Sequence, residues 1–353
     1  MVLSVNMKYK QCVKCGQPGT LSGVDPKKAI YCKSCFIASV KHKFASAIGK
    51  RRIFKDGQRK AIIVYEGNQE SAFLISQIAQ SLSAGNKRLT IEPTVVVLVT
   101  ATDEESINKV TSAVCRFQEI LKCQWFFVHV ALVLDSIKLN EANAIAGLNL
   151  VEKYKGLLDS CSDVSVRMEL TSLLKDLLLI RIARFLNIDK ILVPDCADVL
   201  ARKVLSSFCF ARAASVACMT GAVDVRFDDV IILRPIRDIC LKEIAIINRF
   251  EGSDSYVILT ETAHLRDTME KSVQSATTNF FYEQLNEGFK GVLNTVLSTS
   301  SKLKLPTDNK NRCLLCYSMF LSLQAERFCH GCSLIFDEVG EKDVIEEVLL
   351  MEN

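Results

Sequence analysis

The sequence predicts an α/β protein with a doubly wound, parallel, five-stranded sheet, flanked by one small cysteine-rich module near each end of the chain. Short apolar runs rich in β-branched residues alternate with longer amphipathic segments, which is the pattern of a parallel sheet covered by helices. Four cysteines also gather near each terminus. With 353 residues, 49% hydrophobic and 24% charged, the chain can form one core domain with small additions.

Five runs are short and apolar enough to be buried strands, and four segments between them have helical spacing. The predicted strands span 61–65, 94–100, 125–132, 191–194 and 230–233. The predicted crossover helices span 71–82, 104–123, 167–186 and 199–213, and residues 137–163 are expected to form a helical insertion. No run of 18 uninterrupted apolar residues occurs, so we expect no membrane segment.

The first cysteine set predicts a metal site. Two C-x-x-C pairs are separated by 16 residues, so that four thiolates can converge tetrahedrally on one ion. The alternative is a set of disulfides. The opening residues MVLSVNMKYKQ lack the apolar stretch of a signal peptide, and thiols stay reduced in the cytosol, so we expect a cytoplasmic protein. The ligands of this first structural zinc ion would be Cys12, Cys15, Cys32 and Cys35.

The second cysteine set repeats this design with 12 residues between its pairs, and it predicts a second structural zinc ion. His330 lies inside the second pair and could replace a cysteine as ligand. We rank it as a neighbour of the site. The expected ligands are Cys313, Cys316, Cys329 and Cys332.

A basic stretch follows the first cysteine set. Eight basic residues lie between positions 41 and 60, against one acid. A solvated helix face is the ordinary explanation of such a run. Its place directly after a metal module, together with His42 and Phe44, favours contact with a nucleic-acid backbone and bases. The expected contact residues are Lys41, His42, Lys43, Lys50, Arg51, Arg52, Arg59 and Lys60.

The turn after the first strand is where a doubly wound protein usually binds phosphate. A phosphate cradle needs glycines and a helix N-terminus free of competing anions. The turn 65–71 has one glycine, Gly67, and two acids, Glu66 and Glu70. Their charges disfavour a nucleotide, and Glu70 is better explained as an acid that complements the helix macrodipole. We therefore expect no ATP on this chain.

Six further cysteines are mostly expected to be buried, unreactive thiols, and one histidine is expected to lie in the core. The single cysteines lie mostly in apolar contexts, where a free buried thiol is the default. Two of them, Cys196 and Cys240, lie near strand ends where a substrate could arrive. His129 lies within an apolar strand and is expected to be a hydrogen-bonded core residue. The other four of the six are Cys115, Cys123, Cys209 and Cys218.

Several landmarks together give the chain a recognisable identity. They are the first cysteine module with 31–36 (YCKSCF), then 41–44 (KHKF) leading to 48–50 (IGK), then 234–238 (RPIRD) followed by 241–243 (LKE), and the terminal module. With these motifs the sequence resembles the cytoplasmic tRNA 2-thiolation protein 2 family, the second subunit of the eukaryotic wobble-uridine thiolase. The likeness runs from about Cys12 to about Cys332.

The resemblance implies the fold of the PP-loop ATP-pyrophosphatases, which is like that of the adenine nucleotide hydrolases, and it also shows where catalytic motifs have been lost. Active relatives have SGGxDS after the first strand, and here only Gly67 of that motif remains. Of their GHNxDD motif only Asp198 remains. Their C-x-x-C pair after the third strand, which serves an iron-sulfur cluster or carries sulfur, is reduced to Cys161, so no cluster is expected. The degenerate loop comprises Tyr65, Glu66, Gly67, Gln69 and Glu70, with Asp198.

The same resemblance places Arg234 and Arg237 at the open edge of the cleft. They could contact phosphates or pair with Asp238 and Glu243, and the sequence leaves both possibilities open. The expected domains are a zinc module over 1–40, a basic connecting helix over 41–60, the degenerate PP-loop domain over 61–300, a second zinc module over 306–340 and an acidic tail over 341–353.

The function implied by the resemblance is 2-thiolation of the wobble uridine, as 5-methoxycarbonylmethyl-2-thiouridine, in lysine, glutamate and glutamine tRNAs. This chain would be a non-catalytic partner that binds tRNA and forms a heterodimer with a catalytic paralogue. A ubiquitin-related modifier with a C-terminal thiocarboxylate would donate sulfur to that paralogue. The alternatives are an active sulfurtransferase, with Asp198 binding magnesium and Cys196 or Cys161 as nucleophile, and a scaffold that binds only proteins.

Overall fold

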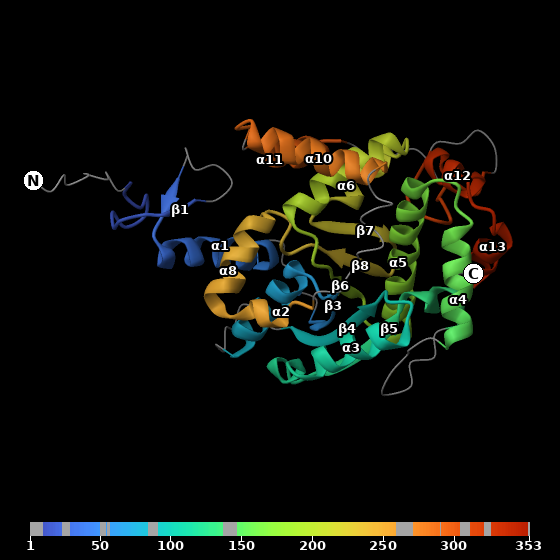
Figure 1. Cartoon of the computed structure of the whole chain (residues 1–353), viewed down its shortest axis with the longest axis horizontal. Helices are drawn as coiled ribbons and strands as arrows, with labels where there is room; N and C mark the ends of the chain where they lie inside the picture. The colour runs from blue at the N-terminus through green and yellow to red at the C-terminus, as the bar shows by residue number, and fades with distance from the viewer. Residues whose placement is uncertain are drawn as a thin grey trace, which may run out of the picture.

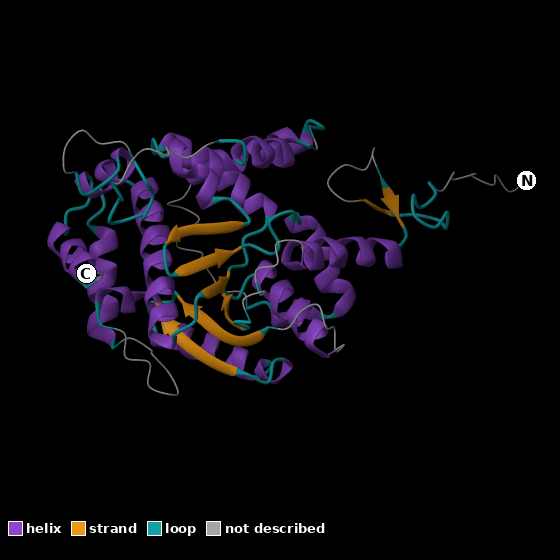
Figure 2. Cartoon of the chain, turned by 180° about the vertical axis from the view of Figure 1, so that it is seen from behind, coloured by secondary structure: helices purple, strands orange, loops and turns teal. Residues whose placement is uncertain are grey.

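The computed structural model describes residues 10–22, 29–49, 54, 57–83, 91–136, 147–258, 271–289, 291–303, 311–320 and 326–351. Its centre is a six-stranded sheet with helices on both faces, as Figure 1 and Figure 2 show from opposite sides. The strand order is β5-β4-β3-β6-β8-β7. The strands are β3 (Lys60–Tyr65), β4 (Glu92–Val99), β5 (Gln124–His129), β6 (Lys190–Leu192), β7 (Val223–Phe227) and β8 (Val230–Leu233).

Five of these strands are the predicted ones, and they are parallel. The strand order runs outward from β3 in both directions, through β4 on one side and through β6 on the other. This reversal is a topological switch point, where the loops after β3 and β6 leave the sheet in opposite directions and a crevice for ligands normally opens. The residues that follow these two strands therefore form the natural place to look for chemistry.

The sixth strand, β7, was not predicted. It lies at the sheet edge, antiparallel to β8, with an irregular register between Asp224 and Phe227. Its alternation is inverted, because the charged Asp224 and Arg226 are buried while Val225 is 59% exposed. A search for apolar runs passes over such a strand. Inward-pointing charges are one way in which proteins protect a sheet edge against pairing with other chains.

One face of the sheet is covered by helices that bury aromatic and aliphatic side chains against every second strand residue, such as Ile63 and Val95. These helices are α1 (Lys33–Gly49), α2 (Gln69–Ser83), α3 (Glu104–Cys115) and α8 (Leu241–Glu251). The helix predicted over 104–123 is shorter in the structure, because α3 ends at Cys115 and a 3₁₀ turn, η1 (Gln118–Ile120), follows.

The other face packs against the alternate strand residues, such as Ile62 and Val96, and its helices include both the middle and the end of the chain. They are α4 (Leu148–Asp159), α5 (Val164–Leu186), α12 (His330–Asp337) and α13 (Lys342–Leu350). The insertion expected over 137–163 thus contains α4, and its residues 137–146 lie outside the described part of the chain.

A third hydrophobic cluster lies where α6 (Ala197–Cys209) packs against α10 (Val273–Asn286) and α11 (Val292–Ser300), above β7 in Figure 1. Short elements complete the fold: the antiparallel pair β1 (Leu21–Ser22) and β2 (Ile30–Tyr31), the helix α7 (Val216–Met219), and the 3₁₀ turns η2 (Val130–Leu134), η3 (Ala213–Ser215) and η4 (Ser253–Tyr256). Among the described residues no helix is long and apolar enough to cross a membrane.

The expected acidic tail is instead an ordered helix. In α13 the acids face outward, while Val344, Ile345, Val348 and Leu349 are buried in the same core as α5. Arg181 of α5 also donates a hydrogen bond to the carbonyl of Val348. The apolar residues recur at helical spacing, so burial of that face outweighs the acidic composition of the segment.

Candidate functional site

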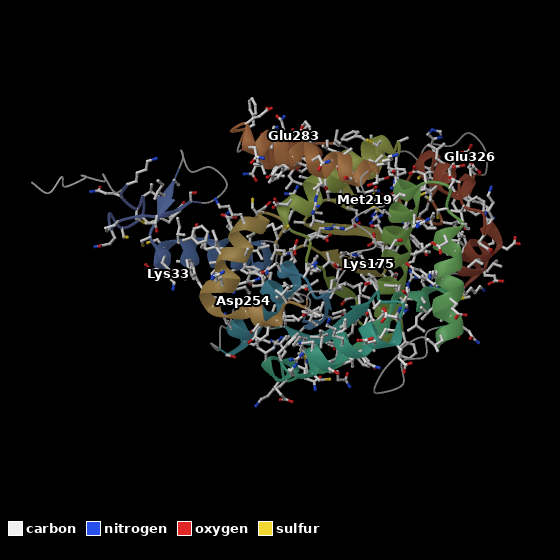
Figure 3. All side chains as sticks on the ribbon, in the orientation of Figure 1. Lys33, Lys175, Met219, Asp254, Glu283 and Glu326 are labelled. Carbon is white, nitrogen blue, oxygen red and sulfur yellow. The ribbon has the colours of Figure 1, made fainter. Side chains whose placement is uncertain are left out.

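The turn between β3 and α2 is held by contacts within the chain. Glu66 pairs with Lys175 of α5 at 2.8 Å, and Figure 3 shows Lys175 on α5 over the sheet. Asn68 caps α2, because its Oδ1 accepts a hydrogen bond from the Ser71 amide at 2.8 Å. Burial lowers the pKa of Lys175, but the nearby carboxylates, Glu66 first, raise it above its ordinary value. Glu66 is therefore neutralised by a partner and does not present a free negative charge.

A network of ion pairs lies close to this pair at the switch point, and the charge of Asp195 from that network also raises the pKa of Lys175. Arg234 joins Asp195 at 3.0 Å to Asp224 at 3.3 Å, and Arg226 binds Asp224 at 2.9 Å. Arg226 also lies 3.5 Å from Asp176, which in turn lies 4.0 Å from Lys203. With the Glu66 and Lys175 pair included, the members are Glu66, Asp176, Asp195, Asp224, Lys175, Lys203, Arg226 and Arg234.

The network contains four carboxylates and four cations, so it has no net charge. Burial alone would raise the pKa values of Asp195 and Asp224. The charge of Arg234 lowers the pKa of Asp195, and the charge of Arg226 lowers the pKa of Asp224. A triphosphate site requires an excess of positive charge and unsatisfied donors. The four cations of this network are already paired with carboxylates. For Glu66, the expected repulsion of a phosphate is thus replaced by a neutral set of ion pairs, whereas Glu70 lies outside this network.

Glu70 and Cys196 form a buried pair between the two loops of the switch point. The Cys196 Sγ lies 3.7 Å from the Glu70 Oε1, and both residues are buried. Burial raises the pKa of Glu70. Burial and the charge of Glu70 both raise the pKa of the Cys196 thiol. Asp198 accepts a hydrogen bond from the Leu241 amide at 2.7 Å. A protonated, enclosed thiol is a poor nucleophile, which removes support from a catalytic role for Cys196.

A later segment of the same chain lies against the degenerate loop. The Ile258 amide donates to the Gly67 carbonyl at 2.8 Å, and the Tyr65 hydroxyl donates to the Tyr256 carbonyl. Gly67 has φ of 77°, a conformation that suits glycine. The cavity left between this loop, the end of β4 and Ile258 is about 20 Å³, enough for roughly one water molecule. Among the described residues, this cavity at the loop is too small for a nucleotide.

The two arginines at the expected cleft edge are both used within the protein. Arg234 is 2% exposed and is bound by two carboxylates and by the Gly221 carbonyl at 3.0 Å. Arg237 pairs with Asp238 at 3.0 Å and donates to the Thr220 and Leu297 carbonyls. Of the alternatives that the sequence left open, pairing holds for Arg237 with Asp238. The carboxylates that hold Arg234 were not foreseen.

The basic stretch divides into paired and exposed residues. Lys41 pairs with Glu251 at 2.5 Å and Lys43 with Glu243 at 2.8 Å, so both fasten α1 to α8. Phe44, expected to stack on bases, is 3% exposed and belongs to the core. The residues that face solvent are His42, Arg59 and Lys60. The expected contacts Lys50, Arg51 and Arg52 lie outside the described residues.

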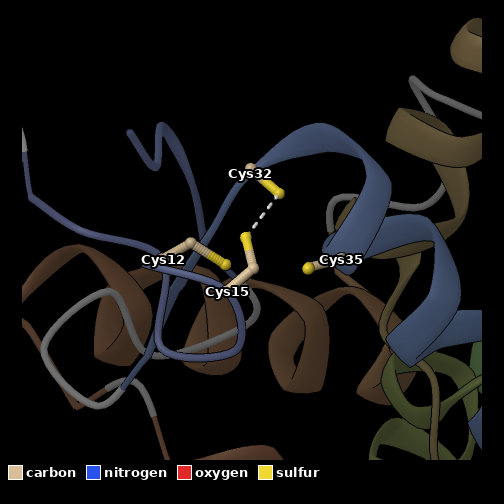
Figure 4. A group of neighbouring side chains, drawn as sticks. All are labelled: Cys12, Cys15, Cys32 and Cys35. Carbon is tan, nitrogen blue, oxygen red and sulfur yellow. Dashed lines mark hydrogen bonds between the residues drawn. The ribbon is translucent and has the colours of Figure 1, made fainter. Parts of the chain in front are cut away.

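Both cysteine clusters bring four sulfur atoms together, within 4.8 Å of one another in each. Four thiolates at about 2.3 Å from a metal would lie about 3.8 Å apart, so the donor set fits a tetrahedral ion. In the first cluster the four side chains point toward a common centre (Figure 4), and the Cys15 and Cys32 sulfurs are 3.6 Å apart. In the second cluster the Cys316 and Cys329 sulfurs are 3.7 Å apart. All eight cysteines are free of disulfides.

The two clusters have the same backbone design. An isolated bridge closes the first C-x-x-C of each, between Gln11 and Pro18 and between Arg312 and Met319. In each cluster a helix begins one residue after the third cysteine, α1 in the first and α12 in the second. The residue after the second cysteine is left-handed in both: Gly16 in the first and Tyr317 in the second. The spacing alone thus predicted a repeated unit.

The two cysteine clusters differ in how deeply they are buried. The second cluster is part of the main core, with Cys313 and Cys332 at 0% exposure, whereas Cys15 of the first cluster is exposed and Cys32 and Cys35 are half-buried. The first cluster stands out beyond the sheet at the end of α1 (Figure 1). His330 is exposed and is not among the four converging ligands.

The expectation of burial holds for His129, Cys196 and Cys240, whereas Cys123 and Cys218 are half-buried. Cys161, Cys196 and Cys240 are buried, and the His129 ring is held by the Ala101 carbonyl at 2.8 Å and the Ala131 amide. The prediction was wrong for Cys115 and Cys209, which are exposed because both lie at the last residue of an amphipathic helix.

Comparison with solved structures defines the fold class of the protein. The chain has the fold of a U34-tRNA thiolase: it matches NcsA from Methanococcus maripaludis, solved with its [4Fe-4S] cluster, with a TM-score of 0.63 and 14% identity over 92% of this chain and 95% of that one. The expected PP-loop architecture, with two four-cysteine clusters added near the termini, is confirmed. No family model matches the chain.

Curated relatives make the assignment particular. The chain is 36% identical over 95% of its length to cytoplasmic tRNA 2-thiolation protein 2 of Caenorhabditis briggsae, and 35% identical to that of Caenorhabditis elegans, covering 96% of each. The human protein of the same name is 25% identical, with 88% of this chain and 72% of the relative covered. The chain belongs to the cytoplasmic tRNA 2-thiolation protein 2 family.

Sequence reasoning missed the residues that close the site. The predicted helix over 167–186 contains Lys175, but no partner was predicted for this charge and no role was predicted for Arg226 or Ile258. Lys175 gave a detectable signal, because a charge in a buried apolar helix needs a counterion. The contacts of Ile258 gave none.

Proposed function

We propose that this chain acts in cytoplasmic tRNA 2-thiolation as a supporting subunit that binds tRNA and pairs with a catalytic paralogue. The observation that supports the proposal is that charged residues at the switch point pair with one another and that Ile258 of the same chain lies against the degenerate loop. The chain also belongs to the tRNA 2-thiolation protein 2 family. ATP-dependent adenylation of the wobble uridine and transfer of sulfur from a thiocarboxylated ubiquitin-related modifier would then fall to the paralogue.

Calorimetry of magnesium ATP tests the division of labour. We expect no binding by the isolated chain, because the Glu66 and Lys175 pair and the Ile258 contact occupy the cradle, and clear binding by the pair of subunits with tRNA. Tight, magnesium-dependent binding by the isolated chain would mean that the 252–258 segment moves away and that this subunit is an enzyme itself.

The tRNA-binding surface would be the basic stretch that includes His42, Arg59 and Lys60, together with residues 50–52. Phosphate contact makes affinity fall steeply with salt, and the log–log slope decreases by about 0.7 to 0.9 for each phosphate that the protein no longer neutralises. Replacing Lys50, Arg51 and Arg52 with Gln should therefore weaken tRNA binding and flatten the slope.

A matched control removes three cations elsewhere. Lys109, Arg116 and Lys122 are exposed in and after α3, and their replacement by Gln changes net charge by the same amount. Binding should then stay close to that of the unmodified chain. If both triple variants bind alike, binding depends on net charge alone and the proposed surface is wrong.

Both four-cysteine clusters would hold structural zinc, which supplies no redox chemistry and links affinity for metal to local folding. Elemental analysis should find two zinc ions per chain. Replacing Cys12 and Cys15 with Ser should remove one and leave the second, because the two sets of ligands are separate. Iron in place of zinc would contradict this assignment.

A further inference from the structure

The residues between the paired cysteines face solvent in the first cluster and contribute to the core in the second. In the second cluster two of these four residues, Leu315 and Gly331, are buried. That cluster is also fastened to the sheet, because the Arg226 Nη1 donates to the Cys316 carbonyl at 2.6 Å. The corresponding four residues of the first cluster are all exposed: Val13, Lys14, Lys33 and Ser34. One backbone design thus serves the core near one end of the chain and presents a surface near the other.

Charge is strongly segregated along the sequence. Residues 1–55 contain 12 lysines and arginines and one acid, Asp25. Subtracting these from the 44 basic and 40 acidic residues of the whole chain leaves 32 basic and 39 acidic residues in 56–353. The described ranges 10–22 and 29–49 contain no aspartate or glutamate. A surface that carries cations without acids attracts polyanions, whereas the rest of the chain has a net negative charge.

The cations of the first cysteine module and α1 divide into two groups. Lys41 and Lys43 fasten α1 to carboxylates of α8, so these two hold the module in place. Lys10, Lys14 and Lys33 are exposed. The Lys33 Nζ lies 4.4 Å from the centre of the Phe250 ring, and Figure 3 labels Lys33 where α1 begins, beside the first cluster. The exposed group lies on the part of the molecule that stands out beyond the sheet (Figure 1).

Short hydrogen-bonded loops fix the backbone positions of Lys14 and Lys33. The Cys12 amide donates to the Gln17 carbonyl at 2.7 Å, and the Gly16 amide donates to the Cys12 carbonyl at 2.9 Å. At the other pair the Phe36 amide donates to the Cys32 carbonyl at 2.9 Å, which closes the turn that contains Lys33. The two loops meet at the cysteine cluster (Figure 4). Such preorganised positions reduce the ordering cost of binding.

We propose that the first cysteine module is a phosphate-binding platform for tRNA, on which Lys10, Lys14 and Lys33 each contact the RNA backbone. The inference rests on the proposed function, in which this chain binds tRNA, and it extends the binding surface beyond the basic stretch that follows the module. The second module has no such role, because its residues between the cysteines contribute to the core.

Binding of a lysine tRNA transcript to the full-length chain, measured at several salt concentrations, tests this inference. The variant Lys10→Gln, Lys14→Gln, Lys33→Gln removes the three exposed cations. Each lost phosphate contact lowers the log–log slope by about 0.7 to 0.9, so the slope should fall by about 2 to 3. If the affinities of variant and unmodified chain meet at about 1 M salt, this change corresponds to about 100- to 500-fold weaker binding at about 0.1 M.

Two control variants separate this role from packing and from net charge. Replacing the same three lysines with Arg keeps their charge and should keep the affinity and the slope. Replacing Lys109, Arg116 and Lys122 with Gln removes an equal charge from exposed positions in and after α3, and should leave the slope close to that of the unmodified chain. Equal weakening in both triple Gln variants would overturn the inference, because binding would then depend on net charge alone.

Chemical footprinting detects the contact without a substitution. An amine-acetylating reagent, followed by mass spectrometry, should modify Lys14 and Lys33 in the unmodified chain and modify them much less once tRNA is bound. Lys109 should react equally with and without tRNA. If the triple Gln variant does not fold, footprinting decides between the outcomes.

The outcomes distinguish two failures. Absence of tRNA binding by the unmodified chain, both alone and with its catalytic paralogue, would overturn the proposed function on which the inference rests. Salt-dependent tRNA binding that the triple Gln variant retains, with Lys14 and Lys33 still reactive in the complex, would overturn the inference while the proposed function stands. Loss of pairing with the paralogue at unchanged tRNA affinity would also overturn it, because the module would then serve a protein partner.

Discussion

Replacing Arg234 with Met removes the cation that joins Asp195 to Asp224 at the switch point. Asp224 has a fully buried side chain, and the variant leaves it with Arg226 as its remaining partner. Removing one partner of a buried ion pair costs about 3 to 5 kcal/mol, because a charge is left uncompensated in the interior. The carbonyls of Gly221 and Cys218 also lose a donor.

That free energy converts into a measurable shift in melting temperature. With an entropy of unfolding of about 2.1 cal/mol/K per residue over 353 residues, the fall in Tm is about 4 to 7 °C. Calorimetric or fluorescence-monitored melting measures it, and Arg327→Met serves as the surface control, for which an exposed ion pair predicts a change of about 0 to 1 kcal/mol. A Tm within about 1 °C of the unmodified chain, combined with weakened tRNA binding, would show that Arg234 contacts phosphate and would refute the buried network.

Three further outcomes follow from the structure. Glu70→Gln should stabilise the protein at neutral pH. Burial raises the pKa of Glu70 above its ordinary value of 4.5, so the unmodified chain loses stability as pH rises through the folded-state pKa. In denaturant unfolding, the difference in unfolding free energy between the variant and the unmodified chain should therefore widen from pH 5 to 8. Ile345→Ala should cost about 2 to 5 kcal/mol, whereas the 69% exposed Leu350 should tolerate Ala within about 0.5 kcal/mol; equal effects in denaturant unfolding would contradict the packing of α13. Alkylation followed by mass spectrometry should modify Cys209 in the native protein and spare Cys196 until unfolding; early labelling of Cys196 would reopen its candidacy as a nucleophile.

The parts of the fold that the sequence predicted are those specified by local pattern. The five parallel strands are short apolar runs, and the two metal clusters follow from cysteine spacing. β7 was not predicted because its buried positions carry the charged residues Asp224 and Arg226. α13 was not predicted because the acidic composition of the segment was considered without its helical faces.

The candidate site was less predictable, because its partners are distant in the chain. Lys43 meets Glu243 across 200 positions, and Glu66 meets Lys175 across 109. A basic run looks the same in sequence whether its lysines contact phosphate or carboxylates from another helix. The loss of the nucleotide motif was visible in the sequence, whereas the neutral network that takes its place was not.

The hydrogen bond from Arg226 to the Cys316 carbonyl has a consequence for synthesis on the ribosome. Its acceptor is made 90 residues after its donor, which at about 5 to 20 residues per second is a delay of roughly 5 to 18 s. During that interval the edge strand of the sheet carries an inward-facing arginine whose last partner has not yet been translated. The nascent chain must therefore keep that edge from pairing elsewhere until its final cysteine module emerges.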